Sequence, residues 1–536
     1  MSSGTTTGAT ADTAAGRVTG HGMTLSDLVA RHARTGPERP AFADARVART
    51  YGEIDDRVTR LANALAAYGV GHGDRVAVLG LNSVELVESY LAVLRVGAIC
   101  VPVNFRLVAD EIGYALSDSG AMAVICDESF GAAVEAAREH APDLGAVITI
   151  GGGPNPLETA IAGASDEYRE AAVADQDAAF IMYTSGTTGR PKGAVLTHRN
   201  LLLHAFSQIA HLGITPDDKV WLSGAPLFHI AGMAGMIPGL ITGGRTIIAT
   251  SGGFDPAATL ALIERERVTS CFFVPAQWAA MCAVPDIGDR DLSSLRRISW
   301  GAAPASTSLL RTMIDTFPQA QVVTAFGQTE CSPVTCTLRG EDSIRKIGSI
   351  GTPMVNVEVR VVDDDMNDVT PGEVGEIVYR GPTMMREYWN KPAETAEAFR
   401  GGWFHSGDLV RQDPEGYYYV VDRKKDMIIS GGENIYSAEV ENALSGHRKV
   451  ADVAVVGVPH PRWGETPLAV VVPVDPADPP TPEEIEAFSR EKLAAYKRPT
   501  RISVVAELPR NPSGKVLKTR LRDDDAAGTL VSEPSV

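Results

Sequence analysis

The sequence lacks the features that would tie it to an oxidising compartment or to a membrane. Its six cysteines are scattered, with no C-x-x-C pair and no zinc-type spacing to histidine: Cys100, Cys126, Cys271, Cys282, Cys331 and Cys336. A disulfide framework or a structural zinc is therefore not expected, and a reducing cytoplasm fits this pattern. No stretch approaches the roughly 18 uninterrupted apolar residues of a membrane helix, so no transmembrane segment is expected.

Positive charge is also scarce. The chain carries 49 Lys and Arg against 67 Asp and Glu, which gives a net charge of −18. Nucleic-acid binding needs a broad basic face, so a nucleic-acid partner is not expected. An anionic substrate must instead be held by local positive groups against an unfavourable overall field.

Short apolar runs alternate with helical segments over most of the chain. Strands are expected at 74–80, 101–104, 121–126, 146–150, 219–223, 245–249, 270–274, 297–300 and 321–325. This alternation predicts an α/β fold built from layered, largely parallel sheets. From about residue 345 the apolar residues recur with period two, which predicts a small antiparallel β subdomain over residues 345–421.

A charged cluster marks a further boundary. The string Asp422-Arg423-Lys424-Lys425-Asp426 separates two apolar strands, and the residues beyond it suggest an α+β unit of about 100 residues. We therefore expect a large N-terminal domain over residues 23–424 and a small α+β domain over 425–522. The tails, 1–22 and 523–536, are predicted to be disordered. The first of them lacks the apolar core and the basic start of a signal peptide.

The most distinctive loop follows a predicted buried strand at Ala178–Met182. Its sequence is Thr184-Ser185-Gly186-Thr187-Thr188-Gly189, and Lys192 comes shortly after it. Gly186 and Gly189 permit backbone angles that turn successive N–H groups inward onto an anion. The hydroxyl groups add donors and Lys192 adds a mobile positive charge, so we expect this loop to bind a polyphosphate.

The alternative for this loop is a solvated Ser/Thr/Gly linker. Two observations favour the phosphate site: the loop follows the buried strand directly, and it ends in Pro191-Lys192-Gly193 before another apolar stretch. It is not a Walker A loop, because the string does not match G-x-x-x-x-G-K-[ST].

The loop closely resembles the phosphate-binding signature of the adenylate-forming superfamily, which includes acyl-CoA synthetases, peptide-synthetase adenylation domains and beetle luciferases. Other strings match the family in order and spacing over roughly residues 25–520, and the closest likeness is to bacterial fatty-acyl-CoA synthetases. These strings are Gly301-Ala302-Ala303-Pro304, Phe326-Gly327-Gln328-Thr329-Glu330, Trp403–Leu409, Ile429–Tyr436 and Leu508–Lys518.

The resemblance implies a nucleotide site. Gly301, Ala302 and Ala303 offer a flat backbone ledge and Phe326 an aromatic face, so a purine could lie between them; tight turns in a core are the alternative. In the family these positions flank the adenine, more often with Tyr where this chain has Phe326, so stacking survives and a hydroxyl contact is lost. The same string adds Gly327, Gln328 and Thr329 to the expected nucleotide contacts.

The acidic residues of these strings have implied roles as well. By resemblance Glu330 binds the Mg²⁺ that bridges the ATP phosphates, with Thr184 nearby, and an oxygen ligand suits this hard cation. Asp408 would accept hydrogen bonds from both ribose hydroxyls, and Arg423 is a second ribose or phosphate contact. The alternatives are an exposed acid for Glu330 and ordinary turn chemistry for Asp408.

The C-terminal unit is expected to carry two half-sites. Lys515 occupies the position of the family's catalytic lysine, where an ammonium would stabilise charge growing on the α-phosphate; a solvated surface lysine is the alternative. The loop with Ser430, Gly431 and Gly432 would line the channel for the CoA pantetheine, or form a simple turn, and Ser437 departs from the proline usual there. One domain cannot present Lys515 and the pantetheine channel to the substrate at the same time. The resemblance therefore implies that the domain rotates about a hinge at Lys425, in a charged and poorly packed linker.

An acyl pocket is expected next to His229, which matches a family residue at the acyl and thioester site; a satisfied core histidine is the alternative. The other candidate residues, which would equally suit core packing, are Phe228, Ile230, Met233, Met236, Trp300 and Cys331. No Asp occurs in 226–240, where peptide-synthetase domains keep one for an α-ammonium, so an acid without an amino group is favoured.

The leading hypothesis is a cytoplasmic acyl-CoA synthetase that uses ATP, Mg²⁺ and CoA to activate a fatty or other apolar carboxylic acid. One rival passes the acyl-adenylate to an amine or a carrier-protein thiol. Another is a non-catalytic nucleotide sensor, against which the joint presence of Lys515, Glu330 and Asp408 argues. Chain length, aromatic or aliphatic substrate, and a homodimeric state stay open.

Overall fold

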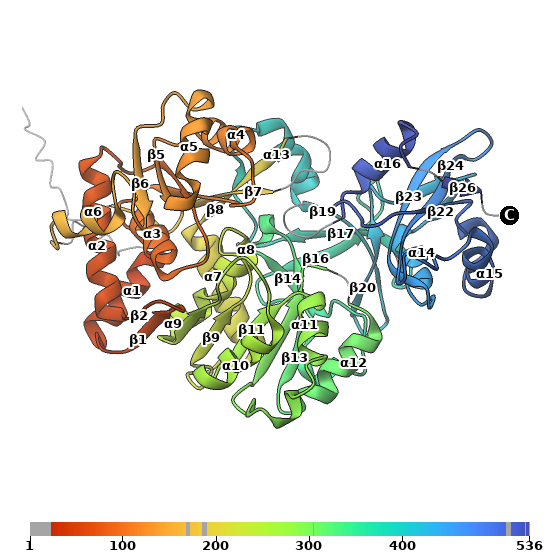
Figure 1. Cartoon of the computed structure of the whole chain (residues 1–536), viewed down its shortest axis with the longest axis horizontal. Helices are drawn as coiled ribbons and strands as arrows, with labels where there is room; N and C mark the ends of the chain where they lie inside the picture. Colours follow the sequence, from red (N-terminus) through yellow and green to blue (C-terminus); the bar gives the residue numbers. More distant parts are fainter. Residues whose placement is uncertain are drawn as a thin grey trace, which may run out of the picture.

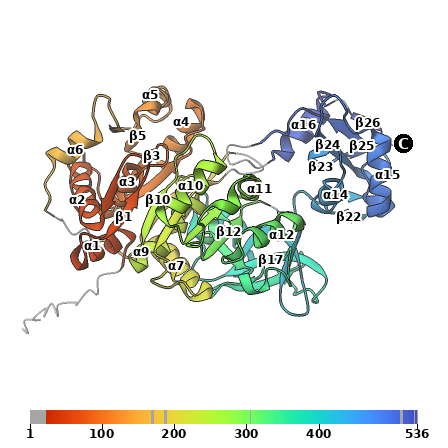
Figure 2. The same cartoon turned by 60° about the horizontal axis from the view of Figure 1, so that its bottom comes forward.

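The computed structural model describes residues 23–167, 172–184, 190–303, 305–510 and 516–530, and the backbone of 532–534. The predicted tail at 1–22 therefore lies outside the described residues. Three sheets build the part up to residue 423 and a fourth sheet builds the part that follows. The fourth sheet and its helices lie at one end of the molecule in both views (Figures 1 and 2).

The first large sheet has seven strands in the order β18-β8-β7-β4-β3-β5-β6. Its strands are β3 (Arg75–Leu79), β4 (Ile99–Val103), β5 (Ala123–Asp127), β6 (Ala146–Ile150), β7 (Ala178–Thr184), β8 (Lys192–Thr197) and β18 (Glu387–Tyr388). The strands from β7 to β6 run parallel, and β7 and β8 form an antiparallel hairpin that β18 extends. The predicted strands of this region are confirmed.

Both faces of this sheet are covered. Along β3, Val76 and Val78 point into one apolar cluster and Ala77 and Leu79 into another. The first cluster also contains side chains of α2 (Tyr51–Ala67) and α3 (Val84–Arg95), and the second contains those of α4 (Ala109–Ser119) and α5 (Gly131–Ala137). Short α6 (Leu157–Gly163) follows β6. Burial on both faces explains why these strands read as continuous apolar runs.

The second large sheet has nine strands in the order β15-β14-β13-β12-β11-β9-β10-β1-β2. They are β1 (Pro40–Ala43), β2 (Ala48–Thr50), β9 (Val220–Ser223), β10 (Arg245–Ile248), β11 (Ser270–Phe273), β12 (Arg297–Gly301), β13 (Gln321–Gly327), β14 (Val334–Thr337) and β15 (Thr352–Pro353). From β1 to β13 neighbouring strands are parallel, as the alternation with helices predicts. Its helices are α1 (Leu25–Thr35), α7 (His198–Leu212), α8 (Ile230–Gly235), α9 (Ile237–Thr242), α10 (Pro256–Glu266), α11 (Pro275–Cys282) and α12 (Thr307–Thr316).

The third sheet is small and antiparallel. It contains β16 (Glu358–Val362), β17 (Val374–Arg380), β19 (Phe404–Gln412) and β20 (Tyr418–Arg423), and α13 (Pro392–Ala398) precedes β19. The period-two pattern of the sequence predicts strands at 357–362, 375–379 and 417–421 but not β19, because Ser406-Gly407 resembles a turn. Gly407 adopts a φ of 71°, which glycine tolerates, and the β17–β19 register shifts at this point while the strand continues.

The C-terminal unit is an α+β structure with its own apolar clusters. Its strands are β21 (Ile428–Ser430), β22 (Glu433–Ile435), β23 (Val450–His460), β24 (Gly464–Pro473), β25 (Arg501–Val504) and β26 (Ser532–Pro534). Its helices are α14 (Ser437–Leu444), α15 (Pro482–Lys492) and α16 (Lys518–Ala526). Among the described residues no helix has the length and apolar character needed to span a membrane.

The chain beyond residue 522 is more ordered than its composition suggests. Helix α16 runs to Ala526, and β26 pairs with β25. The acidic run that resembles a solvated tail supplies Asp525, whose carboxylate is buried and lies 2.5 Å from Arg501 Nη2. A disordered tail starting at residue 523 is therefore wrong, because an ion pair with β25 holds this end of the helix.

Removal of that carboxylate tests the correction. Asp525→Ala should lower the free energy of unfolding of the C-terminal unit by about 1–2 kcal/mol, since it removes a buried ion pair from the Arg501 guanidinium. Denaturant titration followed by hydrogen exchange over β25 measures the effect. Asp524→Ala is the matched control, because in the described part of the chain the Asp524 side chain makes only an exposed pair with Arg520 at 3.8 Å. Equal loss in both variants would contradict the structural role of Asp525.

A buried histidine lies in the central core between the sheets. His204 of α7 is fully buried, and its Nε2 accepts a hydrogen bond of 3.1 Å from the Val334 N–H. The neutral ring therefore carries its proton on Nδ1, for which the described residues offer no acceptor. Burial lowers the pKa of His204 to about 3.

This pKa predicts acid sensitivity. Below pH 6.5 the unfolded chain protonates His204 while the folded chain does not, so the free energy of unfolding falls as pH falls from about 6.5 toward 3. From pH 7 to 5.5 the loss from His204 alone should be about 1 kcal/mol. Urea titrations of wild type and His204→Asn at both pH values measure it. The exposed His140→Asn should behave as wild type, and a His204→Asn variant with an unchanged pH slope would refute the assignment.

Candidate active site

The β7–β8 hairpin ends at the predicted phosphate loop. Thr184 and Lys192 face each other across the hairpin, and the Thr184 hydroxyl donates a 3.3 Å hydrogen bond to the Lys192 carbonyl. The buried strand predicted before the loop is confirmed. The predicted loop contacts Ser185, Gly186, Thr187, Thr188 and Gly189 lie outside the described residues. The structure therefore fixes the two ends of the loop.

Glu330 lies close to this hairpin. It follows β13 in a single 3₁₀ turn, Thr329–Cys331, and its side chain is 7% exposed, so an ordinary exposed acid is excluded. The Tyr388 hydroxyl donates a 2.8 Å hydrogen bond to Glu330 Oε1. Oε2 has no partner among the described residues. The Lys192 ammonium lies 4.7 Å from the centroid of the same tyrosine ring.

Tyr388 was not predicted from the sequence. It is 58 residues from Glu330 along the chain and lies near Lys192 only because β18 pairs with β8. No local pattern around residue 388 indicates either contact. The signal is a strand pairing between distant segments, which a single sequence does not reveal.

The proposed adenine ledge ends β12, beside the end of β13. Gly301 pairs with Ala325, and a Cβ at Gly301 would lie 2.1 Å from the Ala325 carbonyl oxygen, so glycine is required there. Ala302 has a φ of 65° and is exposed together with Ala303, while Phe326 is half-buried. The carboxyl ends of these parallel strands thus bring the ledge and the aromatic ring to one edge, where Gly327, Gln328 and Thr329 continue the chain.

The third predicted group lies in the small sheet. Asp408 of β19 is opposite Arg423 of β20, and Asp408 Oδ1 is 2.5 Å from Arg423 Nε. Asp408 is 4% exposed and therefore not a solvated turn residue. Glu376 supports this segment by accepting the Gly407 N–H at 3.0 Å. Burial opposes ionisation of Glu376, but hydrogen bonds from His405 and Gly407 hold its pKa below the ordinary value.

The two acidic centres approach each other around Cys331. Burial raises the pKa of the Cys331 thiol, and the charges of Glu330 and Asp408 raise it further. Cys331 packs in the same apolar cluster as Tyr379 and Phe404 of the small sheet. Residues from the nine-stranded sheet and the small sheet thus meet in one region.

Metal binding depends on the chemistry of the available donors. Among the described residues no group of three or more His, Cys, Asp or Glu side chains could hold a metal alone. Glu330 offers one buried carboxylate, whose Oε2 has no described partner, near Lys192 at one end of the predicted phosphate loop. This fits Mg²⁺, which is commonly bound through one or two carboxylates plus substrate phosphates and water.

His229 caps the N-terminus of α8. Its Nδ1 accepts the Ala231 N–H at 3.2 Å, and burial lowers its pKa, so the neutral ring carries a proton on Nε2. The acyl-pocket candidates on the same core are Ile230, Met233, Met236 and Cys331. Trp300 belongs to a separate cluster under α10–α12, and Phe228 packs edge-on against Phe105.

The C-terminal residues of the predicted site are only partly described. Lys515 lies outside the described residues. Gly431 and Gly432 follow Ser430 in the exposed β21–β22 turn, with φ values of 60° and 88°. Trp463, which the sequence analysis missed, is 41% exposed and covers Gly431, whose N–H donates a 2.8 Å hydrogen bond to the Trp463 carbonyl. The Arg462 guanidinium lies 4.3 Å from the Trp463 ring centroid.

The predicted hinge is better anchored than its charge suggested. Lys425 is exposed, but Asp422 and Asp426 beside it are buried. Asp422 accepts the Ser437 N–H at 2.5 Å and the Ser437 hydroxyl at 3.2 Å, and Arg522 reaches Asp426 at 3.1 Å. The linker is therefore not poorly packed. Ser437 uses an N–H that the family's proline would lack.

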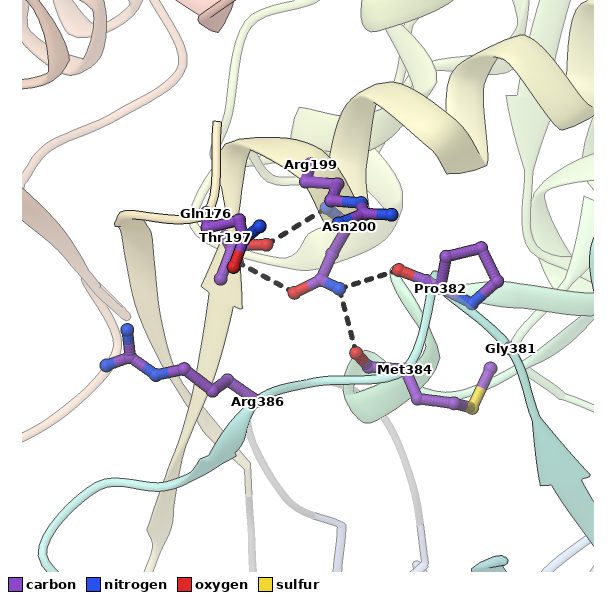
Figure 3. Close-up of a pocket in the computed structure, with 8 residues that line it drawn as sticks. All are labelled: Gln176, Thr197, Arg199, Asn200, Gly381, Pro382, Met384 and Arg386. Atoms are coloured by element: carbon purple, nitrogen blue, oxygen red, sulfur yellow. Dashed lines mark hydrogen bonds between the residues drawn. The ribbon is translucent and has the colours of Figure 1, made fainter. Parts of the chain in front are cut away.

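A surface cavity of about 330 Å³ lies at the opposite end of β8 from the phosphate loop. Figure 3 shows that its arginines, Arg199 and Arg386, point in different directions. Asn200 donates to the carbonyls of Pro382 and Met384 at 2.7 and 2.9 Å (Figure 3). These bonds anchor the segment that enters β18 and so help to hold Tyr388 in place. None of the residues that line the cavity belongs to the predicted site.

The chain matches the model of the AMP-binding enzyme family over residues 29–389 and that of its C-terminal domain over 439–515. It is 43% identical to a feruloyl-CoA synthase of Amycolatopsis sp over 93% of this chain and 98% of the relative. It is 37% identical to an indoleacetate–CoA ligase of Aromatoleum aromaticum, over 95% and 100%. A long-chain-fatty-acid–CoA ligase of Mycobacterium tuberculosis is 36% identical, over 93% and 98%.

Solved structures agree with these relatives. An o-succinylbenzoate CoA synthetase of Bacillus subtilis in complex with its acyl-adenylate has a TM-score of 0.83 at 34% identity, covering 92% of this chain and 98% of that one. The same enzyme has been solved with ATP and a magnesium ion. The chain therefore belongs to the AMP-binding enzyme family, as an acid–thiol ligase of the acyl-CoA synthetase branch of the adenylate-forming superfamily.

Proposed function

We propose that this enzyme joins an aromatic carboxylic acid to AMP with release of pyrophosphate, and then transfers the acyl group to CoA with release of AMP. The observation that carries the proposal is the meeting of Thr184, Lys192 and Glu330 at the end of the β7–β8 hairpin. The choice of an aromatic acid is supported by the relatives at 43% and 37% identity, which act on ferulate and indoleacetate by name. A fatty acid is the second candidate, supported by the 36% identical relative.

In the first half-reaction the substrate carboxylate attacks the α-phosphorus of ATP, and the bond from that phosphorus to the bridging oxygen of pyrophosphate breaks. Thr184 and the loop at 185–189 bind the phosphates, and Glu330 would hold Mg²⁺, which neutralises phosphate charge. Lys192, which follows the loop in sequence and faces Thr184 across the hairpin, adds a positive charge. Lys515 stabilises the charge that grows on the α-phosphate oxygens.

The nucleoside is held by residues at the ends of β12 and β13 and in β19. Adenine lies between the ledge at 301–303 and the Phe326 ring, and Asp408 accepts hydrogen bonds from the ribose hydroxyls. Arg423, already bonded to Asp408, orients that carboxylate. No charged partner for an α-ammonium is needed, which agrees with an acid without an amino group.

In the second half-reaction the CoA thiol attacks the carbonyl carbon of the acyl-adenylate, the carbon–oxygen bond to AMP breaks, and the thiol proton passes to solvent. His229 carries its free proton on Nε2, so it serves as a hydrogen-bond donor to the acyl oxygen and not as a base. The C-terminal unit rotates about Lys425 between the steps. Gly431, Gly432 and the exposed Trp463 then form the entrance for the pantetheine chain.

Transfer to a carrier protein is a second acceptor to consider, because a fatty acid–acyl-carrier-protein ligase of Streptomyces coeruleorubidus is 34% identical over 94% of this chain and 96% of that protein. The exposed Trp463–Arg462 pair favours CoA, since an aromatic face and a guanidinium suit a nucleotide with phosphates.

The substrate class is tested by acid-dependent exchange of pyrophosphate into ATP over a panel of hydroxycinnamates, indoleacetate, benzoates and fatty acids. Aromatic acids should give kcat/KM at least tenfold above any fatty acid, and CoA should then be consumed with formation of AMP. A higher kcat/KM for a long-chain fatty acid would reverse the substrate assignment. Exchange without CoA consumption would favour the carrier-protein acceptor.

The two half-sites of the C-terminal unit should separate by mutation. Lys515→Ala should lower adenylate formation on the order of a hundredfold or more, yet leave CoA capture of supplied acyl-adenylate nearly intact. Trp463→Ala should do the reverse and raise KM for CoA about tenfold. Tyr68→Ala, another exposed aromatic residue, is the control. Equal loss of both steps in either variant would contradict the division.

A further inference from the structure

We propose that Tyr388 is a positioning residue that stands between the Glu330 carboxylate and the Lys192 ammonium and keeps these opposite charges from pairing with each other. The inference rests on the proposed function, because it assigns the two charges to Mg²⁺ and to phosphate. It adds a role for a residue that neither the sequence pattern nor the family strings indicated.

The contacts of Tyr388 use its two ends for different charges. The hydroxyl donates to Glu330 Oε1 at 2.8 Å, and the ring face lies 4.7 Å from Lys192 Nζ. In the described part of the chain no ion pair joins Lys192 to Glu330.

The backbone fixes the tyrosine in this place. Tyr388 pairs with Ala194 across β18 and β8, and the Trp389 N–H donates to the Gly193 carbonyl at 2.7 Å. The Met385 N–H donates to the Glu330 carbonyl at 2.6 Å. The segment that carries Tyr388 is therefore bonded both to the strand that begins at Lys192 and to the turn that carries Glu330.

This arrangement preserves two charges that would otherwise neutralise each other. A carboxylate and an ammonium at short range form an ion pair, and the pair would weaken the attraction of Glu330 for a cation and of Lys192 for phosphate. The phenol binds the ammonium through its quadrupole and the carboxylate through its hydroxyl, without adding charge. It also occupies Oε1, so Oε2 remains for the metal.

Three variants of the full chain separate this role from simple packing. Tyr388→Phe keeps the ring and removes the hydroxyl, Tyr388→Leu removes both contacts, and the third adds Lys192→Gln to Tyr388→Leu. Calorimetry measures the binding of α,β-methylene-ATP with and without Mg²⁺, over a series of Mg²⁺ concentrations. Tyr90→Phe is the control, because it deletes a buried hydroxyl that has no described partner.

We expect Tyr388→Phe to raise the Mg²⁺ midpoint on the order of tenfold while nucleotide affinity without metal stays at the wild-type value. Tyr388→Leu should raise the midpoint further and weaken metal-free binding as well. Adding Lys192→Gln should bring the midpoint back toward that of Tyr388→Phe, because Glu330 is released from the new ion pair. A packing role predicts no such rescue.

An unchanged Mg²⁺ midpoint in Tyr388→Phe, or a double variant no better than Tyr388→Leu, would overturn the inference. A crystal structure of Tyr388→Leu gives a readout that needs no ligand: Lys192 Nζ should move within ion-pair distance of Glu330, and separate charges would refute the proposal. If the wild type binds no nucleotide, the proposed function fails, and the crystal structure of Tyr388→Leu still decides whether Tyr388 separates the two charges.

Discussion

The pairing of one short strand with the β7–β8 hairpin determines where the functional side chains lie. β18 contributes only Glu387 and Tyr388, yet it adds to the edge of the seven-stranded sheet and brings a tyrosine next to Lys192 and Glu330. Lys192 comes from the hairpin, Glu330 from the end of a strand in the other large sheet, and Tyr388 from the approach to the small sheet. Without this pairing Tyr388 would not contact both Lys192 and Glu330.

In this region individual positive side chains must attract anionic substrates although the molecule as a whole is negatively charged. The chain carries a net charge of −18, and the proposed substrates ATP and CoA are anions. Arg423 neutralises Asp408, and Lys192 lies on an aromatic ring and not on a carboxylate. Positive charge is thus kept available where phosphate would bind.

Much of the fold could be predicted because buried parallel strands have short, continuous apolar sequences that alternate with helical segments. β3, β4 and β7 were indicated in this way, since both of their faces are covered. β19 was not, because Ser406-Gly407 permits a turn and only the pairing with β17 shows that the strand continues. Residues 523–526 resembled a tail because the partner of Asp525 is distant in sequence. Glu330 and Asp408 stand in recognisable strings, whereas Tyr388 and Trp463 acquire their surroundings from long-range contacts.

The apolar clusters end at the junction between the two parts of the molecule. Among the described residues, the three clusters of the N-terminal part contain none beyond Tyr418, and those of the C-terminal part begin at Ile428. Turning one part against the other would therefore exchange polar contacts such as Asp422 with Ser437, each of which contributes about 1.5–3 kcal/mol. The rotation would not expose to water any of the described apolar clusters, because none of them spans both parts. Such a rotation would be energetically an exchange of hydrogen bonds, compatible with microsecond-to-millisecond motion.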